Sequence, residues 1–171
     1  MSANNGIPLL WGAGTLNNGL LQSALTLLSS DTGWNSITNG STAVSSVGGS
    51  SGVFTNANTG QAMIGDLYLT LGAIGSALSA GAVLSGWFLK SLDGGTTFET
   101  AVSGAALARA PDFIIRLPAT TISAGSVYAT DGTHKITVPA VPFKVFVQNN
   151  TGQTFASSGN TLKLATPTAD Y

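Results

Sequence analysis

Several segments of the chain alternate apolar and polar residues, which is the pattern of a β-strand with one buried face. Leu67, Leu69 and Leu71 alternate with Tyr68 and Thr70. The same period of two recurs further along the chain. It predicts strands at 83–90, 112–118, 127–129, 135–138, 143–148 and 161–164.

Residues 67–89 contain no charged side chain, and an uncharged stretch of this length could span a bilayer as a helix. The alternation is that of strands, however, and small residues typical of a loop occupy positions 75–81. Two antiparallel strands joined by a loop therefore fit better than a membrane helix. We expect no membrane partner.

Glycine-containing turn signals separate the expected strands. Asn39-Gly40 is a turn signal between residues 35–37 and 42–44, which predicts two short strands separated by a turn. Asp93-Gly94-Gly95 predicts another turn, and the Ala-rich segment 101–110 fits either a helical turn or an irregular crossover. About eight strands with turns at short intervals predict an all-β fold, a single-domain antiparallel β-sandwich that is jelly-roll-like.

The first 30 residues carry no charged side chain. Leucines between Thr15 and Leu28 have helix-like spacings although Gly19 weakens a helix, so a short amphipathic helix and an extended arm are both open. We therefore divide the chain into an N-terminal arm or short helix at 1–30 and a β-sandwich domain at 31–171. No basic residue precedes the first apolar ones, so we expect no secretory signal.

Charged residues make up 8% of the chain, whereas roughly 25% is ordinary. The six Lys and Arg are scattered and the net charge is −1, so the chain has no electrostatic footprint for a phosphate backbone. We expect no nucleic-acid partner. Few charges also mean little repulsion between molecules, which makes self-association or docking on a larger assembly easier.

Patterns that could indicate catalysis or metal binding are weak. Residues 48–52 match G-x-S-x-G, and Asp66 and His134 follow in the order of a hydrolase triad. However, Ser50 lies in a Ser-rich loop, not after a buried strand. The acidic residues lack the spacing of metal ligands, and the segment 93–99 is more simply a turn than a calcium loop. We predict no enzyme, no catalytic residue, no metal and no cofactor.

The tryptophans have different surroundings. Trp87 lies in an expected strand and is assigned to the core. Trp11 lies beside Leu9 and Leu10 in the charge-free arm, and tryptophan is enriched at interface hot spots. Trp11 could therefore anchor in a partner's pocket, and packing on its own domain is the alternative.

Four stretches between residues 36 and 164 consist of strand and turn signatures. They are SITNGSTA at 36–43, FLKSLDGGTTF at 88–98, RAPDF at 109–113, and FKVFVQNNTG at 143–152 with GNTLKL at 159–164. In these stretches the chain resembles the head decoration, or cement, proteins of tailed bacteriophages. The resemblance implies a jelly-roll sandwich on the capsid exterior that clamps neighbouring major capsid subunits, made in the bacterial host cytoplasm. Such proteins are symmetric homo-oligomers.

On this interpretation the N-terminal arm is the segment that grips the capsid, because a charge-free segment outside the sandwich needs apolar surface to cover it. The expected interface residues are Leu9, Leu10, Trp11, Leu20 and Leu21. The alternative is a phage tail or fibre-associated binding module with a lectin-like β-sandwich. That class should show exposed aromatic and acidic residues clustered in one concave site.

Overall fold

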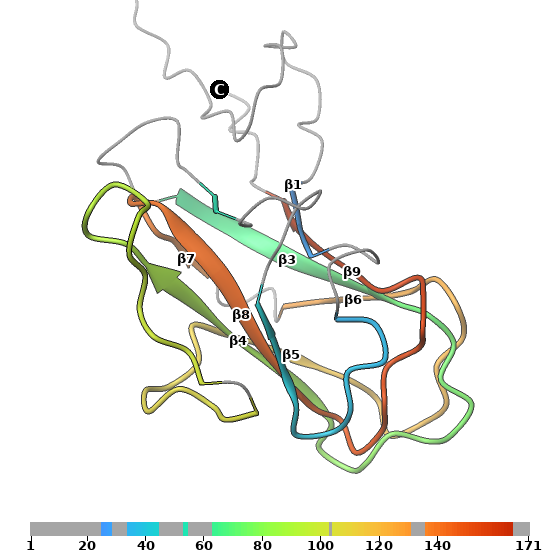
Figure 1. The fold of residues 1–171 in the computed structure, drawn as a ribbon. Coiled ribbons are helices and arrows are strands. Elements are labelled where there is room, and N and C mark those ends of the chain that lie inside the picture. Colours follow the sequence, from blue (N-terminus) through green and yellow to red (C-terminus); the bar gives the residue numbers. More distant parts are fainter. Residues whose placement is uncertain are drawn as a thin grey trace, which may run out of the picture.

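The chain folds into two antiparallel β-sheets, shown in the computed structural model of Figure 1. The structure describes residues 25–28, 34–44, 53–54, 63–102, 104–130 and 136–165, and the regular elements within these residues are all strands. The prediction of an all-β, antiparallel β-sandwich is therefore confirmed. The strands are β1 (Leu25–Leu28), β2 (Thr42–Val44), β3 (Met63–Leu71), β4 (Val83–Lys90), β5 (Phe113–Arg116), β6 (Ser126–Ala129), β7 (Ile136–Val138), β8 (Phe143–Asn150) and β9 (Thr161–Ala165).

The order of strands in each sheet is set by pairings between distant parts of the chain. The four-stranded sheet has the order β2-β8-β4-β5, with β4 and β8 paired along their full length from Val83↔Asn150 to Lys90↔Phe143. The five-stranded sheet has the order β1-β9-β3-β6, and β7 pairs with the start of β3. The long central strands β3, β4 and β8 thus form the framework of the sandwich.

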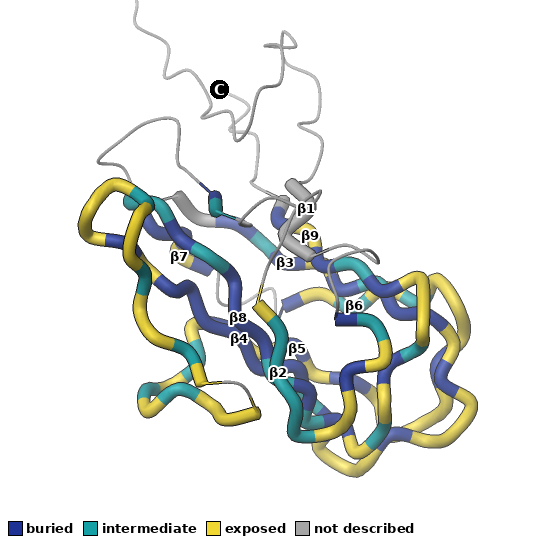
Figure 2. The backbone as a smooth tube through the Cα atoms, in the orientation of Figure 1, coloured by how far each residue is buried: buried dark blue, intermediate teal, exposed yellow. Residues whose placement is uncertain are grey.

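The main core lies between the two sheets and follows the alternation seen in the sequence. Leu67, Leu69 and Leu71 are fully buried, whereas Tyr68 between them is 39% exposed on the outer face of its sheet. Figure 2 shows the central strands as mostly buried and the loops at their ends as mostly exposed. The four-stranded sheet contributes the fully buried Leu84, Ile115, Phe143, Val145 and Val147 to the same cluster.

The uncharged region between Asp66 and Lys90 forms strands, as predicted. The structure contains no helix of the length and apolar character needed to cross a membrane among the residues it describes. The two strands do not pair with each other, however, because β3 belongs to the five-stranded sheet and β4 to the four-stranded sheet. The loop at 72–82 therefore carries the chain from one sheet to the other.

Of the two short strands predicted on either side of Asn39-Gly40, the one at 42–44 is confirmed as β2 and the one at 35–37 is wrong. Residues 35–37 form a turn, with Ser36 at a φ of 57° and the Ile37 N–H donating to the Trp34 carbonyl at 3.4 Å. Gly40 has the positive φ of a turn residue, 81°, so the turn signal itself was sound. The strand that follows it, β2, pairs with β8 about a hundred residues later, a partner that local sequence does not reveal.

The only described part of the first 30 residues is β1, which pairs with β9 at the edge of the five-stranded sheet. For Leu25–Leu28 the helix alternative is therefore wrong, and these residues belong to the sandwich. The expected interface residues Leu9, Leu10, Trp11, Leu20 and Leu21 lie outside the described residues.

Candidate functional site: a clamped loop on the outer face of a sheet

A long loop covers part of the outer face of the four-stranded sheet. It connects β4 to β5 through residues 91–112, described except for residue 103, and we call it the cap loop. Beneath it, Trp87 of β4 and Phe146 of β8 lie opposite each other with ring centroids 5.6 Å apart. Trp87 is 2% exposed, which confirms its assignment to a core. Together with Leu89 these rings form a second, smaller core, on which the cap-loop residues Phe98, Ala101 and Leu107 pack.

The burial pattern of β4 shows why this cover is needed. Six consecutive residues of the strand, from Leu84 to Leu89, are buried. Because successive side chains of a strand point to opposite faces, such a run requires a cover on both sides of the sheet. The main core covers the inner face, and the cap loop covers the outer face. The segment 101–110, for which a helical turn was one expectation, is the irregular crossover of this loop.

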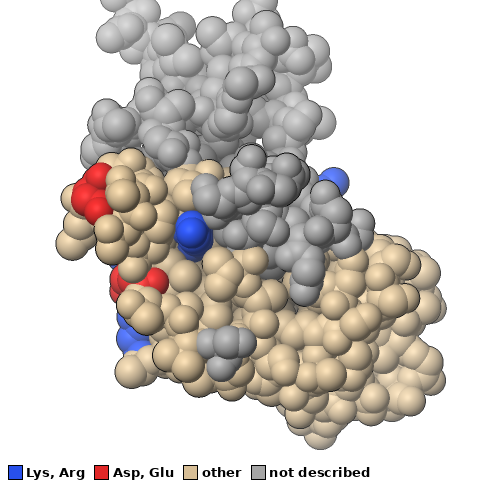
Figure 3. All heavy atoms as spheres, viewed as in Figure 1, with Lys and Arg blue, Asp and Glu red and all other residues tan. Residues whose placement is uncertain are grey.

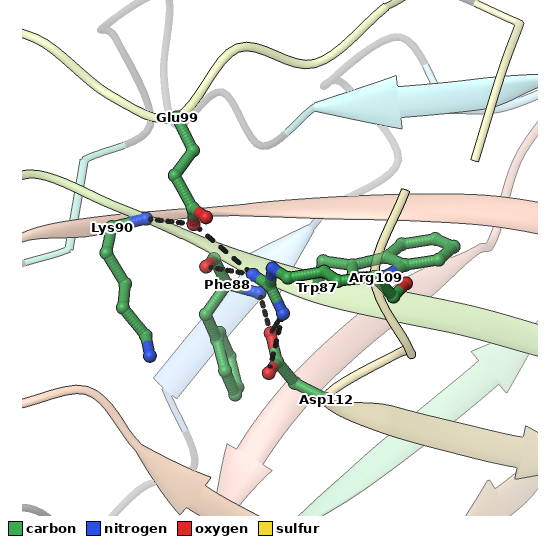
Figure 4. A network of polar contacts seen from close by, with 6 residues as sticks. All are labelled: Trp87, Phe88, Lys90, Glu99, Arg109 and Asp112. Carbon is green, nitrogen blue, oxygen red and sulfur yellow. Dashed lines mark hydrogen bonds and ion pairs between the residues drawn. The ribbon is translucent and has the colours of Figure 1, made fainter. Parts of the chain in front are cut away.

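One arginine holds the cap loop closed, as Figure 4 shows. Nη1 of Arg109 donates to both carboxylate oxygens of Asp112, each at 2.8 Å. Nη2 of Arg109 donates to Oε2 of Glu99 at 3.2 Å and to the carbonyl of Phe88 at 3.0 Å. We call Arg109, Glu99 and Asp112 the Arg109 clamp. It ties the start of β5 and the middle of the cap loop to β4.

The carboxylates of the clamp take the place of a neighbouring strand. β5 pairs with β4 only from Val83 to Gly86, so the rest of this edge of β4 has no strand beside it. There Asp112 Oδ2 accepts from the Phe88 N–H at 2.7 Å, and Glu99 Oε2 accepts from the Lys90 N–H at 3.0 Å. The backbone N–H of Glu99 in turn donates to the Lys90 carbonyl at 3.1 Å. Backbone groups that a buried edge would leave unpaired are thereby satisfied.

The clamp also fixes the tryptophan beneath it. Nε1 of Trp87 donates to the carbonyl of Arg109 at 3.1 Å. The guanidinium and the indole therefore restrain the same short segment from two sides. Near the loop's other end, Nζ of Lys144 lies 4.6 Å from the centre of the Phe98 ring, a cation–π contact.

Glu99 and Arg109 of the clamp are held in their charged forms. Partial burial of Glu99 acts to raise its pKa, but the hydrogen bonds from the Lys90 N–H and from Arg109 outweigh burial and lower that pKa below its ordinary value. Burial acts in the opposite direction on Arg109, and its two carboxylate partners outweigh it and raise the arginine pKa. The clamp is accordingly an ion-paired unit at neutral pH.

The tip of the cap loop is a turn organised by Asp93. Its carboxylate accepts from the Ser91 hydroxyl at 2.6 Å, from the Thr96 N–H at 3.1 Å and from the Thr97 N–H at 2.8 Å and 3.0 Å. The Ser91 hydrogen bond is the largest cause that holds the pKa of Asp93 far below its ordinary value, followed by those from Thr97. These three donors come from the loop itself, in agreement with the prediction of a turn in place of a calcium loop.

Sequence reasoning missed the clamp, and its only local signal was weak. Arg109 and Asp112 are three residues apart next to a predicted strand, but Glu99 and the Phe88 backbone are joined to them only by the fold. The residues of the weak hydrolase pattern, Ser50 and His134, lie outside the described residues. No group of three His, Cys, Asp or Glu side chains that could hold a metal ion occurs in the described ranges.

The candidate site is thus a surface loop whose charged side chains bond to the loop itself and to β4. Scans against models of protein families, against curated proteins and against solved structures found no match for this chain.

Proposed function

We propose that this chain is a non-enzymatic structural protein of a bacteriophage virion. In this role it binds the outer capsid surface and cements neighbouring major capsid subunits. The proposal starts from the four stretches that resemble phage head decoration proteins, and the way the fold uses these stretches supports it.

The resembling stretches contribute the side chains that fix the loops. The stretches 88–98 and 109–113 contain the Asp93 turn, together with Arg109 and Asp112 of the clamp. Asn149 and Asn160, from the two C-terminal stretches, are fully buried and bond to the backbone of neighbouring loops. Rigid loops lower the entropy cost of binding, which benefits a protein that must dock identically at many sites.

The observation that carries the proposal is that most of the described charged side chains fix the cap loop. The described residues include nine charged side chains, and five of them fix the cap loop: Asp93, Glu99, Arg109, Asp112 and Lys144. A partner surface would therefore meet mostly uncharged groups. Such contacts depend little on ionic strength, because salt screens exposed charge pairs and not apolar contacts.

The segment proposed to hold the capsid is the N-terminal arm. It joins the sandwich at β1, an edge strand of the five-stranded sheet. In this proposal the apolar side chains of the arm, with Trp11 as anchor, enter a pocket on the major capsid protein. The sandwich then remains outside the shell as a rigid body.

The test compares two variants of the arm. Replacing Leu9, Leu10 and Trp11 with serine removes three apolar anchors, and replacing Asn4, Asn5 and Gly6 with serine is the matched control in the same segment. Undecorated capsids from the source phage are mixed with each protein, and bound protein is measured after sedimentation of the particles. We expect the control to bind like the wild type and the apolar variant to lose binding at least about tenfold, the loss of about 1.4 kcal/mol. Equal binding by both variants would refute the role of the arm.

The location of the protein tests the whole proposal. Labelling of intact virions and electron microscopy should place the protein on the capsid exterior in many copies. Protein found only at the tail or fibres would refute the proposal and favour the tail-associated binding module.

A further inference from the structure

Asn39 is followed by Gly40, and this pair of residues is chemically prone to spontaneous deamidation. The reaction is an attack by the backbone nitrogen of the second residue on the side chain of the first, and glycine has no side chain to obstruct it. Asn39 is exposed, and both residues lie in the loop 34–41 that precedes β2. The sequence contains two more Asn-Gly pairs, at 5–6 and 18–19, and Asn39-Gly40 is the pair within the described residues.

The fold holds both of the groups that would react. The Gly40 N–H donates to the Asn149 carbonyl at 2.6 Å. Oδ1 of Asn39 accepts from the Gly152 N–H at 2.8 Å. Attack requires that the Gly40 nitrogen lose its proton and that the Asn39 carboxamide turn toward it. Each hydrogen bond opposes one of these requirements, so the pair is protected while the loop is in place.

A small set of hydrogen bonds docks the loop 34–41 on the end of β8. The Asn149 N–H donates to the Ser41 carbonyl at 3.0 Å, and Nδ2 of Asn149 donates to the Ile37 carbonyl at 2.9 Å. Nε2 of Gln148 donates to the Gly40 carbonyl at 3.1 Å. Loops held in this way at the surface open locally at a lower free energy than the whole domain. Opening of this loop therefore releases both reacting groups together.

From this arrangement we propose that Asn39 is a gated deamidation site. The gate is the docking of the loop 34–41 on β8 and on the turn that follows it. Asn39 is protected while the loop is docked and reacts when the loop undocks. This proposal does not depend on the proposed function.

The reaction needs water and base, and no other reactant. In the undocked loop the Gly40 nitrogen gives its proton to base and attacks Cγ of Asn39. A C–N bond forms and closes a succinimide ring, the bond between Cγ and Nδ2 breaks, and the nitrogen takes up a proton and leaves as ammonia. Water then opens the ring at either carbonyl, which leaves aspartate or isoaspartate at position 39.

The isoaspartate product prevents the loop from docking again. Its main chain runs through the former side-chain carbonyl and is longer by one methylene carbon. The Gly40 N–H and the Ser41 carbonyl then no longer both meet Asn149, and the register of β2 against β8 is disturbed. The new carboxylate also adds a negative charge to a loop without charged residues, in the lower right of the molecule, where the visible surface in Figure 3 has no charged atom. Deamidation thus marks irreversibly a molecule whose loop has opened.

Two half-buried glutamines provide a matched pair of variants for the test. Nε2 of Gln148 donates to the Gly40 carbonyl at 3.1 Å, and Nε2 of Gln153 donates to the Ala77 carbonyl at 3.2 Å. Gln148→Ala removes a bond that docks the loop 34–41, and Gln153→Ala removes a similar bond from another loop. Each protein is kept at pH 8 in buffer and in concentrated urea. Peptide mass spectrometry over time gives the deamidation rate at Asn39, and far-ultraviolet circular dichroism in buffer shows that each variant is folded.

In urea, Asn39 should react at the same rate in the wild type and in both variants, because only the local sequence acts there. In buffer, the wild-type rate should be at least about tenfold lower than in urea, which corresponds to an opening free energy of about 1.4 kcal/mol. Gln148→Ala should raise the rate in buffer about two- to tenfold, the range for the loss of one hydrogen bond. Gln153→Ala should react like the wild type.

Three results would overturn the proposal. A wild type that reacts in buffer as fast as in urea has no gate. Equal rates in the two folded variants would show that the docking of the loop 34–41 does not control the reaction. The third result concerns the purified isoaspartate form, in which the Gly40 N–H should exchange with solvent rapidly; protection equal to that of the unmodified protein would show that the loop docks again.

Discussion

Removing the Asp112 carboxylate should open the cap loop without unfolding the sandwich. In Asp112→Ala, the N–H of Phe88 loses its acceptor at 2.7 Å, and Arg109 loses its two-point partner. Phe88 is 1% exposed, so its N–H is shielded by the fold and water replaces the lost acceptor poorly. The variant separates the role of the carboxylate from the packing of the rings beneath the loop.

The magnitude follows from the two losses. A buried donor left without an acceptor costs about 1–3 kcal/mol. The ion pair adds little, because the Arg109 side chain is 34% exposed and retains Glu99 as a partner. We therefore expect Asp112→Ala to lower the free energy of unfolding by about 2–3 kcal/mol, a large part of the roughly 5–15 kcal/mol of a typical domain. Asp112→Asn retains an oxygen acceptor for Phe88 and should lose about 1 kcal/mol.

Two measurements check this prediction. Urea denaturation gives the free energy of unfolding for the wild type and both variants, and amide hydrogen exchange gives the protection of the Phe88 and Lys90 N–H groups. Exchange at Phe88 should accelerate strongly in Asp112→Ala and weakly in Asp112→Asn. If the alanine variant lies within about 0.5 kcal/mol of the wild type, the ordinary range for surface substitutions, the carboxylate does not act as a substitute for a strand.

Two further predictions concern the core beside the clamp and the response to acid. A Cβ atom added at Gly86 would overlap the ring of Phe113, so Gly86→Ala should lower the free energy of unfolding by about 1–3 kcal/mol through overpacking. Gly75 has open space around it, so Gly75→Ala should be nearly neutral in the same denaturation assay. Equal stability of the two alanine variants would contradict the packing described. Because the pKa of Glu99 is lowered on folding, its contribution is complete above the ordinary value of 4.5 and is lost as the pH falls through the lower folded value. Stability measured at pH 7, 4.5 and 3 should therefore decline toward acid, and Glu99→Gln should show a shallower decline; an unchanged slope would show that Glu99 is not coupled to the fold.

The sequence predicted those features that depend on neighbours along the chain. The alternation at Leu67, Leu69 and Leu71 indicated a strand with one buried face, and these side chains are fully buried. Gly40 indicated a turn and has a positive φ. The partner of β2 was not predictable, because a three-residue strand pairs equally well with many partners until the whole sheet selects one.

The candidate site escaped prediction for a related reason. The alternation over 83–90 was recognised, but it assigned Trp87 and Phe88 to opposite faces without showing that both faces are covered. The cover is an irregular loop with no periodicity of its own. The carboxylates that hold the loop accept hydrogen bonds from backbone N–H groups of β4. The sequence pattern does not show which backbone N–H groups need a side-chain partner.

The carboxylates that occupy the edge of β4 also bear on aggregation. An open strand edge beside buried aromatic rings is a template on which a strand of another molecule can add. At Phe88 and Lys90 the N–H and C=O groups that such a strand would use are already bonded, to Asp112, Glu99 and Arg109. Neutralising the charges of the clamp would therefore loosen the loop and also expose the edge of β4 to strands of other molecules. The chain has few charges with which to repel its own copies. The clamp thus closes this edge of a nearly neutral chain to strand addition.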